Sequence, residues 1–125
     1  MDKTTLVGPD IEEGRLFLEL LNTAGVQVDA ALWEWDELSG RWSLLIVAPL
    51  VEELGVKETY RRLDEILSKA SHRPTVDLLN VSVLTPKAWF YRSLHRELRH
   101  ARNLRVTRRP VGDHFVEDGF IYFVK

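Results

Sequence analysis

The chain has 125 residues, of which 45% are hydrophobic and 29% charged, so its size and composition fit one globular domain and exclude a fibrous repeat or a wholly disordered chain. It contains no cysteine, which excludes disulfides, thiolate metal sites and cysteine nucleophiles. Residues 1–65 carry 6 basic and 14 acidic side chains and residues 66–125 carry 11 and 5, so net charges of −8 and +6 sum to the −2 of the whole chain.

The first half of the chain predicts a helix followed by a β-hairpin. Asp10, with an acidic residue three positions later, resembles the capping box that begins a helix. Apolar residues then recur at helical spacing until Gly25. The period then changes to two over 26–35, as expected for a strand. Turn-forming residues at 36–40 lead into a second strand at 42–48.

The next elements are an amphipathic helix, a strand and a third helix. Apolar side chains recur at steps of three and four over 56–70, with charged residues between them. The β-rich run 76–84 follows and ends at Thr85-Pro86, an N-cap residue before a proline at the first helical position. This pattern predicts a third helix over 86–101.

The chain closes with extended segments. Strand-forming residues continue beyond the third helix, and a turn at Asp118-Gly119 is expected before a last strand at 120–124. The whole chain, 1–125, is therefore predicted to be one α+β domain. Its elements follow the order α-β-β-α-β-α-β-β, with about three helices and a mixed sheet of four to five strands.

The third helix is the segment most indicative of function. From Lys87 to Arg109 there are eight Lys or Arg residues and one acidic residue, Glu97, a local net charge of +7. At 100° per residue, basic side chains collect on one side of the helix and apolar ones on the other. The residues predicted to contact an anion are Lys87, Arg92, His95, Arg96, Arg99, Arg102 and Arg105.

Two interpretations of this basic segment remain open. Arginine presents a planar fork of donors that matches phosphate and carboxylate oxygens, so the segment indicates a binding or adaptor module for nucleic acid or for an acidic protein. The alternative is an ordinary solvated helix face that is neutralised by the acidic first half of the chain. No zinc-finger spacing, RRM-type aromatic motif or GXXG loop supports nucleic acid independently.

Three tryptophans flank the predicted hairpin. Trp33 and Trp35 share one face of the first strand, and Trp42 of the second strand is placed to meet them as a cross-strand cluster. These indoles are expected to be core residues, to form a contact between subunits of a homo-oligomer, or to stack on a ligand. A homo-oligomeric structural or regulatory subunit is therefore the second hypothesis.

Catalysis is the third hypothesis, as a small hydrolase or metal-dependent nuclease. His95 and His100 are five residues apart and cannot share one metal on a helix, and no nucleophile elbow, phosphate-binding loop or dinucleotide fingerprint is present. No metal or other cofactor is expected, and no catalytic residue is assigned. The residues left for a site assembled from distant segments are Asp29, Glu34, Asp77, Asp113 and His114.

The sequence also predicts a cytoplasmic protein without a membrane partner. The segment MDKTTLVGPD lacks the apolar core of a secretory signal. The longest uncharged apolar run, Trp42–Val51, is about half of the ~20 residues that a membrane helix needs, and it contains Pro49.

Overall fold

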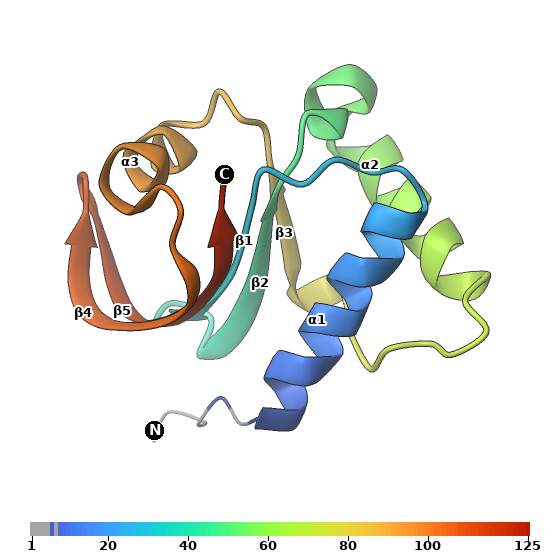
Figure 1. The fold of residues 1–125 in the computed structure, drawn as a ribbon, viewed down its shortest axis with the longest axis horizontal. Helices are drawn as coiled ribbons and strands as arrows, with labels where there is room; N and C mark the ends of the chain where they lie inside the picture. The colour runs from blue at the N-terminus through green and yellow to red at the C-terminus, as the bar shows by residue number, and fades with distance from the viewer. Residues whose placement is uncertain (1–5, 7) are drawn as a thin grey trace.

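The computed structural model describes Leu6 and residues 8–125, and within them the helices and strands follow the predicted order (Figure 1). The segment that argues against a secretory signal lies largely outside these residues. The helices are α1 (Gly8–Thr23), α2 (Leu50–Ser68) and α3 (Trp89–Leu98). The strands are β1 (Ala30–Asp36), β2 (Arg41–Val47), β3 (Val81–Leu84), β4 (Arg102–Val111) and β5 (His114–Val124), with a 3₁₀ turn η1 (Leu78–Asn80) before β3.

The five strands form one mixed sheet in the order β3-β2-β1-β5-β4, which confirms the predicted α+β class. The β2–β3 pair is parallel and the other pairs are antiparallel. A parallel neighbour needs a crossover connection, and α2 with the loop after it provides this connection between β2 and β3. The β1–β2 hairpin is closed by the Asp36 carboxylate, which accepts a hydrogen bond from the Leu38 N–H at 3.0 Å.

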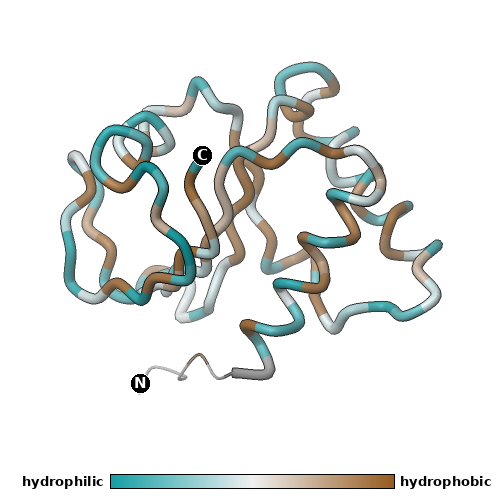
Figure 2. The backbone as a smooth tube through the Cα atoms, viewed as in Figure 1, coloured by the Kyte–Doolittle hydropathy of each residue, from teal (hydrophilic) through white to brown (hydrophobic). Residues whose placement is uncertain are grey.

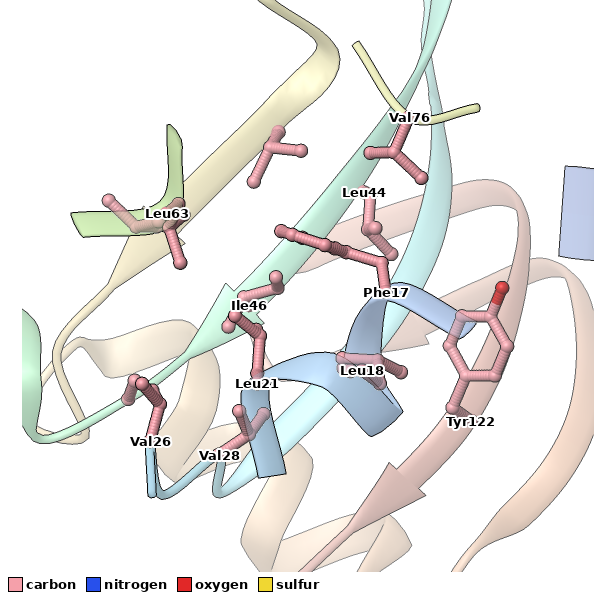
Figure 3. Packing of buried hydrophobic residues seen from close by; sticks show 14 of the residues in the cluster. Phe17, Leu18, Leu21, Val26, Val28, Leu44, Ile46, Leu63, Val76 and Tyr122 are labelled. Carbon is pink, nitrogen blue, oxygen red and sulfur yellow. The ribbon is translucent and has the colours of Figure 1, made fainter. Parts of the chain in front are cut away.

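Different helices cover the two faces of the sheet, α1 and α2 on one face and α3 on the other (Figure 1). Because successive strand residues point to opposite faces, Trp33 lies in the core on the α1/α2 side and the preceding Leu32 lies under α3. Burying a large apolar side chain of this kind contributes about 1.5–3 kcal/mol. Figure 3 shows residues that fill the α1/α2 core: Phe17, Leu18, Leu21, Leu44, Ile46 and Leu63.

The β4–β5 hairpin curls around α3 (Figure 1). Asn103 and Arg108 of β4 have positive φ angles of 51° and 46°. Neither they nor the residues opposite them in β5, Tyr122 and Glu117, are paired, so the ladder is interrupted at two points without a change of register. A residue in the left-handed region departs from the extended conformation of a regular strand. The bent hairpin brings its tip against α3, where the Gly112 N–H donates to the Glu97 carboxylate at 2.7 Å.

The third helix is shorter at both ends than the sequence predicts. Its start is delayed because the Ala88 N–H donates to the Thr85 carbonyl at 3.0 Å, closing a turn in which Pro86 occupies the second position. It ends at Leu98 because Arg99 is extended and His100 has a φ of 74°, after which the chain pairs with β5. The predicted helix over 86–101 is therefore α3 at Trp89–Leu98.

The predicted turn at Asp118-Gly119 is also wrong. Both residues lie inside β5, and the chain reverses earlier, at Gly112 and Asp113. Gly119 is required for a close approach between strands, because a Cβ atom there would lie 2.8 Å from the Trp33 carbonyl oxygen. The Asp-Gly pair thus serves packing within the sheet, a use that its local sequence does not distinguish from a hairpin turn.

None of the helices in the described part of the chain combines the length and the hydrophobicity that a membrane span requires. Figure 2 shows hydrophilic residues on the visible turns of α3 and along much of β4, whereas the central strands carry mainly hydrophobic ones. The basic segment predicted from the sequence is therefore divided between a helix and the neighbouring edge strand.

Candidate nucleic-acid interface and neighbouring polar groups

Helix α3 is buried on one side and basic on the other. Phe90, Leu94 and Leu98 pack into the core beneath it. At about 100° per residue, the side chains opposite this core side fall within a narrow arc of roughly 80° around the helix axis. This arc, called the basic stripe below, consists of Trp89, Arg92, Arg96 and Arg99, all of which are exposed.

The basic stripe has few carboxylates to neutralise it. Within the described residues, Arg92 and Arg99 make no ion pair or side-chain hydrogen bond, and the same holds for Arg102 at the start of β4. Arg96 contacts Glu97 at 3.6 Å, an exposed contact of a kind worth about 0–1 kcal/mol. Within the part of the chain that the structure describes, the acidic N-terminal half does not neutralise this face.

Lys87, one of the residues predicted to contact an anion, forms an ion pair with a residue of the acidic N-terminal half. Its ammonium lies 2.5 Å from the Glu52 carboxylate of α2, although both side chains are largely exposed. The hydrogen bond to Glu52 raises the pKa of Lys87 above its ordinary value. Because Lys87 lies in the turn before α3 and points to α2, it is not part of the basic stripe.

Arg105 is the clearest departure from the predicted anion-binding set. Its Nε and Nη2 atoms donate to the two carboxylate oxygens of Asp118, both at 2.9 Å, and its guanidinium lies over the Trp42 ring at 5.8 Å from the ring centre. The hydrogen bonds that Arg105 donates to Asp118 raise the pKa of Arg105 above its ordinary value. Asp118 is only 4% exposed, so Arg105 neutralises a buried charge within the fold.

His95 is also not on the exposed basic side. Its Nδ1 atom lies 3.0 Å from the Lys125 carbonyl oxygen, and its ring is 5.9 Å from that of Tyr91. The Tyr91 hydroxyl donates to the same carbonyl at 2.8 Å. These contacts attach α3 to the end of β5, which gives His95 a structural role.

The hairpin tryptophans are core residues and not an exposed contact face. Trp33 and Trp35 are 8% and 7% exposed, and Trp42 is partly buried. Trp35 and Trp42 are paired across the hairpin as predicted, with ring centres 5.7 Å apart in an edge-to-face arrangement. The Trp33 indole N–H donates to the Tyr122 hydroxyl at 2.8 Å. A subunit contact through an open Trp33/Trp35 face is therefore not available.

The structure brings together one pair from the set considered for catalysis. The His114 Nε2 atom lies 2.5 Å from the Glu34 carboxylate, at a cavity of about 380 Å³ on the α3 side of the sheet. Burial is the main cause of a raised Glu34 pKa, opposed by the bond to His114. The His114 ring also meets the rings of Phe90 at 4.6 Å and Trp89 at 6.2 Å.

The other three residues of that set lie apart. Asp29 accepts from the Gln27 side chain at 2.9 Å, Asp77 accepts from the Leu79 N–H at 2.9 Å as the cap of η1, and Asp113 is exposed in the β4–β5 turn. Among the residues that the structure describes, no group of three or more His, Cys, Asp or Glu side chains could hold a metal ion. Glu34 and His114 thus form a dyad that no third metal-ligating side chain joins within the described residues.

Trp89 is the residue of this region that the sequence analysis missed. Its side chain is 55% exposed, which is unusual for an indole, and it lies at the start of α3 on the same face as the arginines. The signal was present in the sequence, since Trp89 lies three residues before Arg92 and seven before Arg96. Trp89 is assigned to neither side of the helix by the sequence analysis.

Comparison of this chain with protein-family models, with curated proteins and with solved structures finds no match.

Proposed function

We propose that this protein binds single-stranded nucleic acid along the basic stripe of α3. Arg92, Arg96 and Arg99 contact phosphates, and the Trp89 indole stacks on a base. The observation that carries the proposal is an exposed tryptophan in line with arginines that have almost no carboxylate partners within the described residues. Proteins that bind single strands combine these two elements, cationic groups for the backbone and aromatic side chains for the bases.

The contrast with α2 supports a functional basis for the charge. An ordinary solvated helix mixes signs because pairs three or four residues apart stabilise it by a few tenths of a kcal/mol. Helix α2 does so, with Arg61 paired to Glu58 and Lys69 paired to Glu65. The outer face of α3 lacks such pairs, so mutual repulsion of its guanidiniums is a cost that an anionic ligand would remove.

Trp89 favours a single strand over a duplex or an acidic protein. An exposed indole has a flat apolar face, and base stacking on such a face is worth about 1–3 kcal/mol per base. Bases inside a duplex are already stacked and do not offer that face. Trp89 and Arg99 are ten positions apart, so at 1.5 Å per residue the stripe is about 15 Å long and accommodates a few nucleotides.

The overall charge of the chain limits how tightly and where the ligand binds. The net charge is −2, and the N-terminal half is acidic. Binding is therefore confined to the α3 face and has no general electrostatic attraction to support it. We expect affinity that falls steeply with added salt, since released counterions provide much of the binding free energy.

The test is fluorescence anisotropy with a labelled single-stranded oligonucleotide, titrated at several salt concentrations. The Arg92→Glu/Arg99→Glu variant should lose binding, because two phosphate contacts become repulsive. The matched control is Lys57→Glu/Arg62→Glu, which makes the same charge change at exposed residues of α2. The control should bind nearly as the wild type does.

A second variant separates stacking from charge. Trp89→Ala should weaken binding about 5- to 150-fold, the equivalent of 1–3 kcal/mol, at every salt concentration, whereas Trp89→Phe should retain most of the affinity. If both charge-reversal variants weaken binding equally, or if Trp89→Ala binds as the wild type does, the basic stripe is not the binding site. Preference for an acidic peptide over the oligonucleotide would replace nucleic acid by an acidic protein as the partner.

A further inference from the structure

The α1/α2 side of the sheet contains a cavity of about 550 Å³ that lies on the opposite face from the basic stripe. Trp33, Trp35 and Trp42, three of the four tryptophans of the chain, line it. Its other walls come from the start of α1 and from the loop between α2 and β3. Its volume is within the range of about 300–1,000 Å³ that is typical of small-molecule sites.

The aromatic wall of this cavity fits a flat ring. Trp35 and Trp42 meet edge to face across the hairpin, at 5.7 Å between ring centres, so the two indole planes form an angle and not a flat stack. Trp42 is only partly buried, which leaves part of its surface open to the cavity. Aromatic rings prefer offset-stacked or edge-to-face neighbours, and a planar ligand ring could adopt either arrangement here.

The polar groups of the cavity favour a ligand with a negative charge. Arg41 and Arg73 line it, and neither guanidinium has an ion pair or hydrogen bond within the described residues. Among the described residues of the lining, the two acids are already engaged, since Asp77 accepts from the Leu79 N–H and Asp10 also has a partner. The charged donors with unused capacity are therefore the guanidiniums, which match carboxylate and phosphate oxygens.

We infer that this cavity, called the tryptophan cavity below, binds a small planar aromatic anion. Its ring contacts Trp35 and Trp42, and its carboxylate or phosphate group contacts Arg41 and Arg73. The Asn80 carboxamide, also in the lining, can donate to or accept from the edge of a heteroaromatic ring. This site is separate from the basic stripe, so it is independent of nucleic-acid binding at α3.

The test is NMR of the full chain labelled with ¹⁵N, in which each of the four indole N–H groups gives its own resonance. Single Trp→Phe variants assign the resonances. The probes are adenosine monophosphate and indole-3-carboxylate as planar aromatic anions, with adenosine and inorganic phosphate as references. Either aromatic anion should shift the resonances of Trp35 and Trp42, and Trp33 should move less because its N–H is held by Tyr122.

The contribution of the guanidiniums is tested by Arg41→Gln/Arg73→Gln. Affinity for the aromatic anion should fall about tenfold or more, as expected for loss of charge-assisted hydrogen bonds. Adenosine should be unaffected. The matched control is Arg61→Gln/Arg62→Gln, which removes two arginines from α2, outside the cavity lining. Both variants retain the tryptophans, and undisturbed indole resonances show that each is folded.

Three results would overturn the inference. They are the absence of a shift at Trp35 and Trp42 with millimolar concentrations of either aromatic anion, shifts that are confined to Trp89, and shifts that inorganic phosphate alone reproduces. A response at Trp89 alone would instead report binding at the basic stripe. Failure of this inference and failure of the proposed function are thus distinguished by which indole responds.

Discussion

Replacement of Arg105 by methionine should destabilise the protein without affecting the α3 surface. The change removes two hydrogen bonds of 2.9 Å to Asp118, whose carboxylate is almost completely buried, and it keeps most of the aliphatic side chain. Pairs between two exposed groups are worth about 0–1 kcal/mol, whereas breaking a fully buried pair costs about 3–5 kcal/mol. With the Arg105 side chain 42% exposed and that of Asp118 5% exposed, we expect a loss of about 2 kcal/mol.

This loss has a measurable thermal consequence. The unfolding entropy near 60 °C is about 2.1 cal/mol/K per residue, or roughly 0.26 kcal/mol/K for a chain of 125 residues. A loss of 2 kcal/mol then lowers the Tm by about 8 °C, which circular dichroism resolves easily. The control is Arg102→Met, on the same strand but without a partner in the described residues, which should unfold within about 2 °C of the wild type.

Oligonucleotide binding should depend on the α3 arginines and not on Arg105. Arg105→Met should bind as the wild type does at temperatures where it is folded, because its guanidinium is engaged by Asp118. Arg92→Glu/Arg99→Glu should lose binding with little change in Tm. Equal Tm values for the Arg105 and Arg102 variants would refute the argument that Arg105 is a structural residue.

Two further predictions concern buried titratable groups. Burial raises the pKa of Tyr122 to about 12, so absorbance titration should show a tyrosine that ionises only near that pH. Tyr122→Phe should remove this titration step. It should also lower the free energy of unfolding by about 1–3 kcal/mol, because the Trp33 indole N–H loses its acceptor. Burial also raises the pKa of Glu34 above its ordinary 4.5. Between these two pKa values the folded state holds a proton that the unfolded chain has released. The free energy of unfolding should therefore fall as pH rises from about 4.5 through the raised value. Glu34→Gln should flatten this part of the stability profile measured by denaturant titration, and an unchanged profile would show that the carboxyl bonded to His114 does not control it.

The Glu34–His114 dyad is adjacent to the basic stripe, since the His114 ring contacts Trp89. The cavity next to the dyad is acidic, because Asp36, Glu37 and Glu117 also line it. Such a lining repels phosphate, and three metal ligands do not converge within the described residues. In the fold, the dyad links β1, β5 and the start of α3.

The sequence by itself determined the class of fold and the order of its elements. Amphipathic periods distinguish α1 and α2 from the strands, because a helix and a strand repeat at 3.6 and 2.0 residues and these periods are local properties. Local patterns also located the basic segment and the Trp35–Trp42 pair, since a hairpin fixes which residues face each other. These features depend on neighbours along the chain.

Only the tertiary structure decided which charged and aromatic groups are available to a ligand. Arg105 and Arg92 belong to the same basic segment, yet one neutralises a buried carboxylate 13 residues away and the other faces solvent. Similarly, Trp33 is buried by a strand pairing and by Tyr122, whereas Trp89 is exposed. Burial and pairing arise from contacts between distant segments, and composition and spacing along the chain do not contain them.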